Sequence, residues 1–131
     1  MITKELYKKH IVLFEPDSYK KATREEKEKV CNGCGSSRSK FDFVPDNLLG
    51  LSINKCCCIH DWLYEFGKTI EHKNEADRIF LNNMIRTIDR KIDQYWWMKK
   101  LRKRLAKKYY IAVKYFGGSA FWDNKDKKGN K

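Results

Sequence analysis

Apolar residues recur at spacings of three and four along most of this chain, which is the period of an amphipathic helix. Four segments follow the pattern: one from Asp17 or Ser18 to Lys29 or Cys31, one that Ser52 caps and that runs through Phe66, one that begins at Asn74, and one from about Trp96 to Phe116. The pattern of a strand is found nowhere with comparable clarity, and leaves room only for a small hairpin near Phe41 or at Lys68–Glu71. The sequence therefore predicts an all-α fold.

The two later helices each have a predicted buried side. In the third helix this side is a stripe made by Ala76, Ile79 or Phe80, Met84 and Ile88. In the last helix it is made by Trp97, Leu101, Leu105, Tyr109, Ala112, Val113 and Phe116. The lysines and arginines of the last helix are expected elsewhere around it. Residues 31–50, with three glycines, three serines and a proline, are expected to form a long irregular loop, and such a loop inside a small domain usually has a function.

The length of 131 residues corresponds to one domain, which we place at residues 1–122, followed by a disordered basic tail at 123–131. The chain begins with a mixed polar and apolar segment, so we expect no signal peptide. No apolar run approaches the roughly 18 residues of a membrane span. These features predict a protein that is cytoplasmic in the producing cell or carried on a released particle such as a virion, with secretion by a non-classical route as the alternative.

Positive charge is concentrated in the C-terminal third. The formal net charge is +12, and residues 86–131 hold 15 Lys and Arg against four Asp and no Glu, a net of +11. Such a field attracts polyanions, either an anionic phospholipid surface or nucleic acid. The chain carries no recognisable helix-turn-helix, zinc-finger or RNA-binding signature, which makes nucleic acid the weaker partner. A solvated helix face with a basic tail is the plain alternative.

The strongest chemical signal is a histidine followed directly by an aspartate, with a tyrosine one turn later and a second aspartate on the next helix. A helix places His60 and Tyr64 one above the other, and a second, antiparallel helix can bring Asp77 behind His60. This gives a base, a carboxylate that orients it and a hydroxyl that bonds the carboxylate. A neutral imidazole held in this way can deprotonate water. Asp61 points about 100° away and can bind a hard cation such as calcium, with backbone carbonyls from residues 31–50.

The run from Cys56 to Tyr64, CCCIHDWLY, resembles the active-site helix of the secreted phospholipases A2, whose pattern is CCxxHDxCY. Leu63 stands where that family has a cysteine. The segment Glu75–Phe80, EADRIF, resembles the family segment that carries the second catalytic aspartate. As a whole the chain is most similar to small phospholipase A2-like proteins of bacteria and phages. The resemblance implies calcium-dependent hydrolysis of the sn-2 ester of a glycerophospholipid at an anionic membrane surface.

The resemblance also implies the roles of single residues. His60 would be the base, Asp77 its catalytic partner and Asp61 a calcium ligand. Asn32–Gly35 resembles the core of the family's calcium loop.

By that resemblance the further calcium ligands would be Gly33, Gly35 and Ser37, although Ser37 stands where the family has a glycine. Val44–Gly50 resembles the calcium-loop region of compact bacterial members, in which an aspartate, here Asp46, contributes. Both loops stay open as sources of the calcium ligands.

Five cysteines are an odd number, so at least one stays free or pairs elsewhere. Without a signal peptide, reduced thiols are the default expectation, whereas the resemblance places Cys34 and Cys57 at positions that form disulfides in secreted members. A competing interpretation is a zinc site, because Cys31 and Cys34 followed by Cys56–Cys58 and His60 have a zinc-like rhythm. Three consecutive cysteines cannot all face one metal, which weakens it.

A fold of this kind can also persist without activity. The alternative function is therefore a catalytically inactive phospholipase-like protein that serves as a structural component of a phage particle, or that binds an anionic surface or nucleic acid. Hydrolysis of lipid in the presence of calcium separates the enzyme from both of these.

Overall fold

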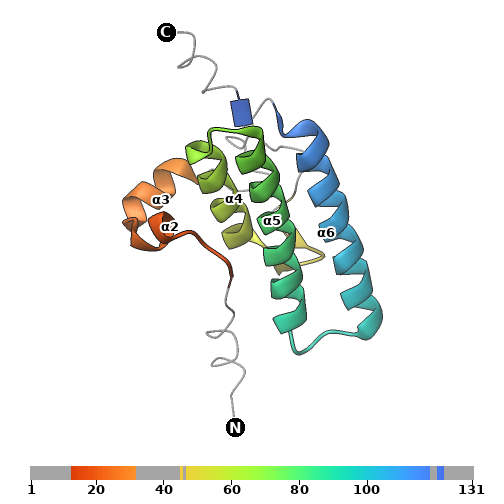
Figure 1. Cartoon of the computed structure of the whole chain (residues 1–131). Coiled ribbons are helices and arrows are strands. Elements are labelled where there is room, and N and C mark those ends of the chain that lie inside the picture. The colour runs from red at the N-terminus through yellow and green to blue at the C-terminus, as the bar shows by residue number, and fades with distance from the viewer. Residues whose placement is uncertain (1–12, 32–44, 46, 119–120, 123–131) are drawn as a thin grey trace.

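The structure, a computed structural model, describes residues 13–31, 45, 47–118 and 121–122 (Figure 1). Its elements in chain order are α2 (Asp17–Lys21), α3 (Arg24–Val30), β1 (Asn47–Leu48), β2 (Leu51–Ser52), α4 (Asn54–Phe66), α5 (Ile70–Arg90) and α6 (Trp96–Phe116). The described chain is mostly helical, which confirms the predicted predominance of helix. The predicted tail at 123–131 and the hairpin considered near Phe41 lie outside the described residues.

The single helix predicted near the N-terminus is two short helices. The residue at the N-terminal cap of α2 is Pro16, whereas Asp17 or Ser18 was predicted, and the helix ends at Lys21. Thr23 then begins α3 with a capping box, in which its hydroxyl accepts from the Glu26 amide and the Glu26 carboxylate accepts from the Thr23 amide. The box satisfies N–H groups at a new helix start. The prediction of one continuous helix was therefore wrong.

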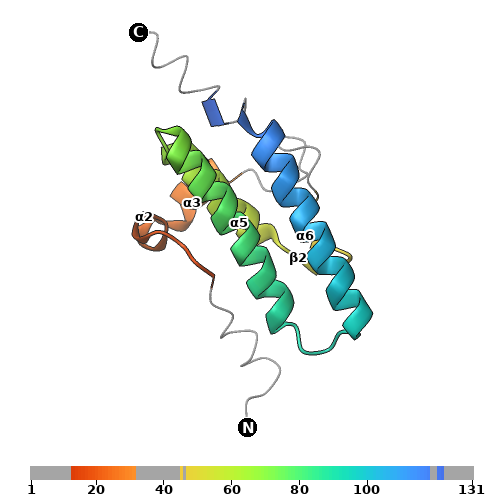
Figure 2. The same cartoon turned by 45° about the vertical axis from the view of Figure 1, so that its right-hand side comes forward.

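α4 and α5 form an antiparallel pair joined by three residues (Figures 1 and 2). α4 ends before Gly67, as predicted. α5 begins at Ile70, earlier than the predicted Asn74, because the Thr69 hydroxyl accepts a hydrogen bond from the His72 amide and caps the helix there. The predicted stripe of α5 is buried, and it packs against α4.

A two-stranded antiparallel hairpin precedes α4, in which Leu48 pairs with Leu51. The sequence pattern did not place it; Lys68–Glu71, the other position considered, spans the end of the α4–α5 connection and the start of α5. Arg102 of α6 holds the hairpin, since its Nε donates to the Leu48 carbonyl and its Nη2 to the Leu49 carbonyl, both at 2.9 Å. The hairpin is thereby fixed beside the helix layer.

α6 has the predicted bounds, and its buried side agrees with the prediction in part, since Val113 is buried and Leu105, Tyr109 and Ala112 pack half-buried against the core. Arg102, Ala106 and Val113 are its buried residues, whereas Trp97, Leu101 and Phe116 of the predicted stripe are exposed. The Arg102 side chain reaches inward to the carbonyls of the hairpin, and Ala106 packs in the core. No helix in the described ranges is long and apolar enough to cross a membrane.

Candidate active site

The antiparallel pair α4–α5 brings the predicted histidine, tyrosine and aspartate together. Nε2 of His60 lies 2.8 Å from Oδ1 of Asp77. The Tyr64 hydroxyl, one turn along α4, donates to the same oxygen at 2.6 Å. Both contacts are buried. The arrangement expected from the spacing of these residues is therefore present in the structure.

Lys73 completes this cluster and was missed in the sequence. It is 3 % exposed, and its Nζ donates to Oδ2 of Asp77 at 2.8 Å and to the carbonyls of Val113 and Lys114 at 3.3 Å. The spacing offered a signal, because Lys73 lies one turn before Asp77 on the same side of α5. Both oxygens of Asp77 are thus hydrogen-bonded, and the carboxylate is tied to the C-terminal part of α6.

Aromatic rings and one glycine surround the cluster. Phe80 stacks on the His60 ring with centroids 4.7 Å apart, and Phe121 meets the Tyr64 ring edge-on at 5.1 Å. A Cβ on Gly117 would lie 2.6 Å from the Tyr64 hydroxyl oxygen. A side chain at this position would therefore displace the tyrosine from Asp77.

The pKa shifts in the cluster follow from its burial and charges. Burial lowers the pKa of His60, and the nearby Asp77 opposes this only in part. Burial alone would raise the pKa of Asp77, but the hydrogen bonds from His60, Lys73 and Tyr64 outweigh it and lower that pKa. Burial and the charge of Asp77 raise the pKa of Tyr64. At neutral pH the cluster therefore holds a neutral imidazole, a carboxylate and a protonated phenol.

These charge states assign the proton on the imidazole. Because the Asp77 carboxylate can only accept, His60 donates to it from Nε2 and keeps its lone pair on Nδ1. The imidazole can then act as a base through Nδ1. The side chain of His60 is only 1 % exposed.

The cysteines next to this cluster are mostly oxidised, which corrects the default expectation of reduced thiols. Cys31 is bonded to Cys58, and Cys57 is also in a disulfide. Disulfide sulfurs are not thiolate ligands, so the competing zinc interpretation is wrong. Cys56 is free and buried beside Thr87, and burial raises the pKa of its thiol to about 11. It is therefore a poor nucleophile.

Of the five predicted calcium ligands, Asp61 lies in the part of the chain that the structure describes. Asp61 lies half-buried on α4. The negative charge of its carboxylate contributes to the raised pKa of Tyr64, so Asp61 interacts electrostatically with the cluster. Gly33, Gly35, Ser37 and Asp46 lie outside the described residues.

Among the residues that the structure describes, no three His, Cys, Asp or Glu side chains gather into a metal site. A calcium site built mainly from backbone carbonyls needs few such side chains. The single carboxylate of Asp61 fits that kind of donor set.

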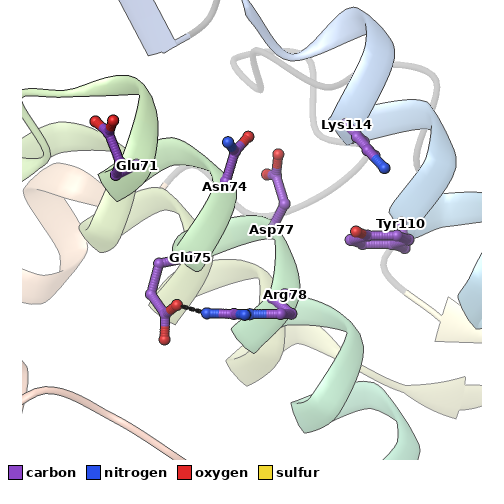
Figure 3. Close-up of a pocket in the computed structure, with 7 residues that line it drawn as sticks. All are labelled: Glu71, Asn74, Glu75, Asp77, Arg78, Tyr110 and Lys114. Carbon is purple, nitrogen blue, oxygen red and sulfur yellow. Dashed lines mark ion pairs between the residues drawn. The ribbon is translucent and has the colours of Figure 1, made fainter.

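A cavity of about 460 Å³ lies between α5 and α6 on the side of Asp77. Asn74 and Asp77 line it from α5, and Tyr110 and Lys114 line it from α6 (Figure 3). Glu71 and the ion pair of Glu75 with Arg78 form its outer part. The cavity therefore carries charges of both signs.

Comparison of the chain with protein-family models, with curated proteins and with solved structures found no match.

Proposed function

We propose that this protein is a calcium-dependent phospholipase A2-like enzyme that hydrolyses the sn-2 ester of glycerophospholipids. The observation that carries the proposal is the buried contact of His60 with Asp77, bonded in turn by Tyr64, with Asp61 next to the histidine. Hydrolysis by an activated water needs a base that is neutral at working pH and held by a carboxylate. The lowered pKa of His60 supplies the neutral base.

In the proposed reaction Nδ1 of His60 takes a proton from water as the water oxygen attacks the ester carbonyl. The imidazolium that forms is stabilised by Asp77, which stays ionised because Lys73 and Tyr64 donate to it. His60 then returns the proton to the departing alkoxide, and the products are a fatty acid and a lysophospholipid. No serine or cysteine nucleophile takes part, in agreement with the raised pKa of the Cys56 thiol.

Asp61 would hold the calcium ion, together with Gly33, Gly35 and Ser37 or with Asp46. When bound, calcium supplies positive charge for the substrate phosphate and for the developing oxyanion. The position of Asp61 directly after His60 supports this role, because the ion would then sit beside the base. The net charge of +11 over residues 86–131 supports an anionic membrane surface as the place of the reaction.

The test is the release of fatty acid from vesicles whose lipids carry a labelled acyl chain at either the sn-1 or the sn-2 position. With calcium, the wild-type protein should release the sn-2 label, and EGTA should stop the release. Release of the sn-1 label alone would contradict the proposed bond. Folded protein that releases neither label would leave an inactive phospholipase-like protein as the better account.

A further inference from the structure

The solvent side of α6 carries apolar and cationic side chains together. The outer face of α6 is defined by eight exposed residues that fall within about 120° of the helix circumference: Trp97, Lys100, Leu101, Arg104, Lys107, Lys108, Ile111 and Tyr115. Its apolar members are 41–68 % exposed. α6 lies at the edge of the helix layer, packed on α5 by its other side (Figures 1 and 2).

The charge of this face is not neutralised by the rest of the described chain. α6 contains eight Lys and Arg and no Asp or Glu. Lys99 and Lys103 pair with Asp89 of α5, at 3.5 and 2.9 Å, and belong to the inner side. Among the residues that the structure describes, the four cations of the outer face form no ion pair with a carboxylate.

We infer that the outer face of α6 docks flat on an anionic phospholipid bilayer. In this mode the apolar side chains enter the boundary between headgroups and acyl chains, and the lysines and arginine stay at the level of the phosphates. Trp97 and Ile111 are 14 residues apart, or roughly 21 Å along the helix. Contact at both positions therefore requires the helix axis to lie parallel to the membrane.

The apolar members favour a bilayer over nucleic acid. Phosphates of nucleic acid account for the cations, and bases can stack on aromatic rings. Neither accounts for Leu101 and Ile111, which are 41 and 49 % exposed on the same side of the helix. An interface of hydrocarbon and anionic headgroups uses both kinds of side chain.

Flat docking of α6 also sets the distance of the site from the membrane. On the inner side of the same helix, the carbonyls of Val113 and Lys114 accept hydrogen bonds from Lys73. Tyr110 and Lys114 also line the cavity at Asp77. The catalytic carboxylate would thus lie about one helix diameter, roughly 10 Å, from the bilayer. The inference rests on the proposed function for the choice of a lipid partner, but docking itself requires no turnover.

Sedimentation with vesicles of phosphatidylcholine and about one third phosphatidylglycerol, with EGTA throughout, tests the inference without hydrolysis. Lys107→Glu/Lys108→Glu should weaken binding roughly 25-fold or more, because each lysine near such a surface contributes about fivefold. The matched control is Lys20→Glu/Lys21→Glu on α2, which changes the net charge equally. Equal losses in both variants would overturn the inference, since binding would then follow net charge alone.

The apolar contribution has its own matched pair. Ile111→Ser on the outer face and Ile70→Ser on α5 remove the same side chain at nearly equal exposure, 49 and 48 %. Ile111→Ser and Trp97→Ser should each weaken binding severalfold, and Ile70→Ser should not. If Trp97→Ser weakened vesicle binding but Ile111→Ser did not, flat docking would be overturned. If the wild-type protein bound duplex DNA but not these vesicles, the lipid partner would be overturned. Wild-type protein that binds but releases no fatty acid with calcium would contradict the proposed enzyme and leave the docking surface standing.

Discussion

The ammonium of Lys73 lies 2.8 Å from Oδ2 of Asp77, one turn along the same helix, and both side chains are buried. The other oxygen of Asp77, Oδ1, accepts hydrogen bonds from the His60 ring and from the Tyr64 hydroxyl. Lys73 is therefore the cation that balances the buried carboxylate of Asp77. Its further bonds to carbonyls of α6 make the position of Asp77 depend on that helix.

Replacing Lys73 by methionine should lower the free energy of unfolding by about 3–5 kcal/mol, because the Asp77 charge stays buried without its cation. The matched control is Lys91→Met. Lys91 also lies 2.8 Å from an aspartate, Asp93, but in an exposed pair, whose loss should cost less than about 1 kcal/mol. Urea unfolding measures both. Equal losses would mean that burial does not set the strength of the Lys73 pair, and recovery in Lys73→Met/Asp77→Asn would support the assignment to the charge.

Gly117→Ala should displace Tyr64, because the added Cβ would lie 2.6 Å from the tyrosine hydroxyl oxygen and would also collide with the Val113 carbonyl oxygen. We expect a loss of about 1–3 kcal/mol in stability and a lower rate of ester hydrolysis. Gly118→Ala is the neighbouring control, since nothing lies within 4 Å of a Cβ there. The account is contradicted if both variants unfold and turn over like the wild type.

Stability should fall on acidification, starting near the ordinary pKa of histidine. Burial lowers the pKa of His60 from 6.5, and the hydrogen bonds described above lower that of Asp77 from 3.8. The unfolded chain therefore takes up protons at a higher pH than the folded protein, so the stability contributed by His60 is lost as pH falls below 6.5, and that of Asp77 below 3.8. Unfolding midpoints over this range, for wild type and His60→Gln, measure the effect. If the wild-type protein became more stable as the pH falls through 6.5, and His60→Gln did not, His60 would instead be a buried imidazolium.

The disulfide between Cys31 and Cys58 closes a separation of 27 residues. Its removal in Cys31→Ser/Cys58→Ser should cost about 3–4 kcal/mol through the greater entropy of the unfolded chain. Of the four cysteines that the structure describes, only Cys56, which is buried in the folded state, should react as a thiol in denatured protein without reductant. A count of five thiols in denaturant would show that the chain is reduced as purified.

The contacts of His60, Tyr64 and Asp77 were predictable from the sequence because their geometry is local. His60 and Tyr64 share a helix face, and a three-residue connection makes the following helix antiparallel and brings Asp77 back to them. Lys73 could have been found by the same spacing, but a lysine is by type a surface residue. Its burial becomes understandable only when Asp77 is seen to need a second partner.

The side that α6 buries was predictable only in part from its apolar pattern, since Val113 is buried as predicted but Trp97 and Leu101 are not. Apolar residues occur around most of this helix, and its burial was decided by contacts with the hairpin at Leu48 and Leu49, far away in sequence. Arg102 therefore turned inward, while Trp97 and Leu101 turned outward. The break between α2 and α3 was missed for another reason, since the capping box at Thr23 is a local signal that competes with the apolar period.

The central claim is that His60 acts as the base in ester hydrolysis, and the most direct test compares two histidine variants in one assay. Release of the sn-2 fatty acid from anionic vesicles with calcium is measured for His60→Gln and for His72→Gln, an exposed histidine on α5. Circular dichroism establishes that each is folded. The account predicts that His60→Gln releases no fatty acid above background while His72→Gln keeps the wild-type rate. Wild-type turnover by folded His60→Gln would contradict it.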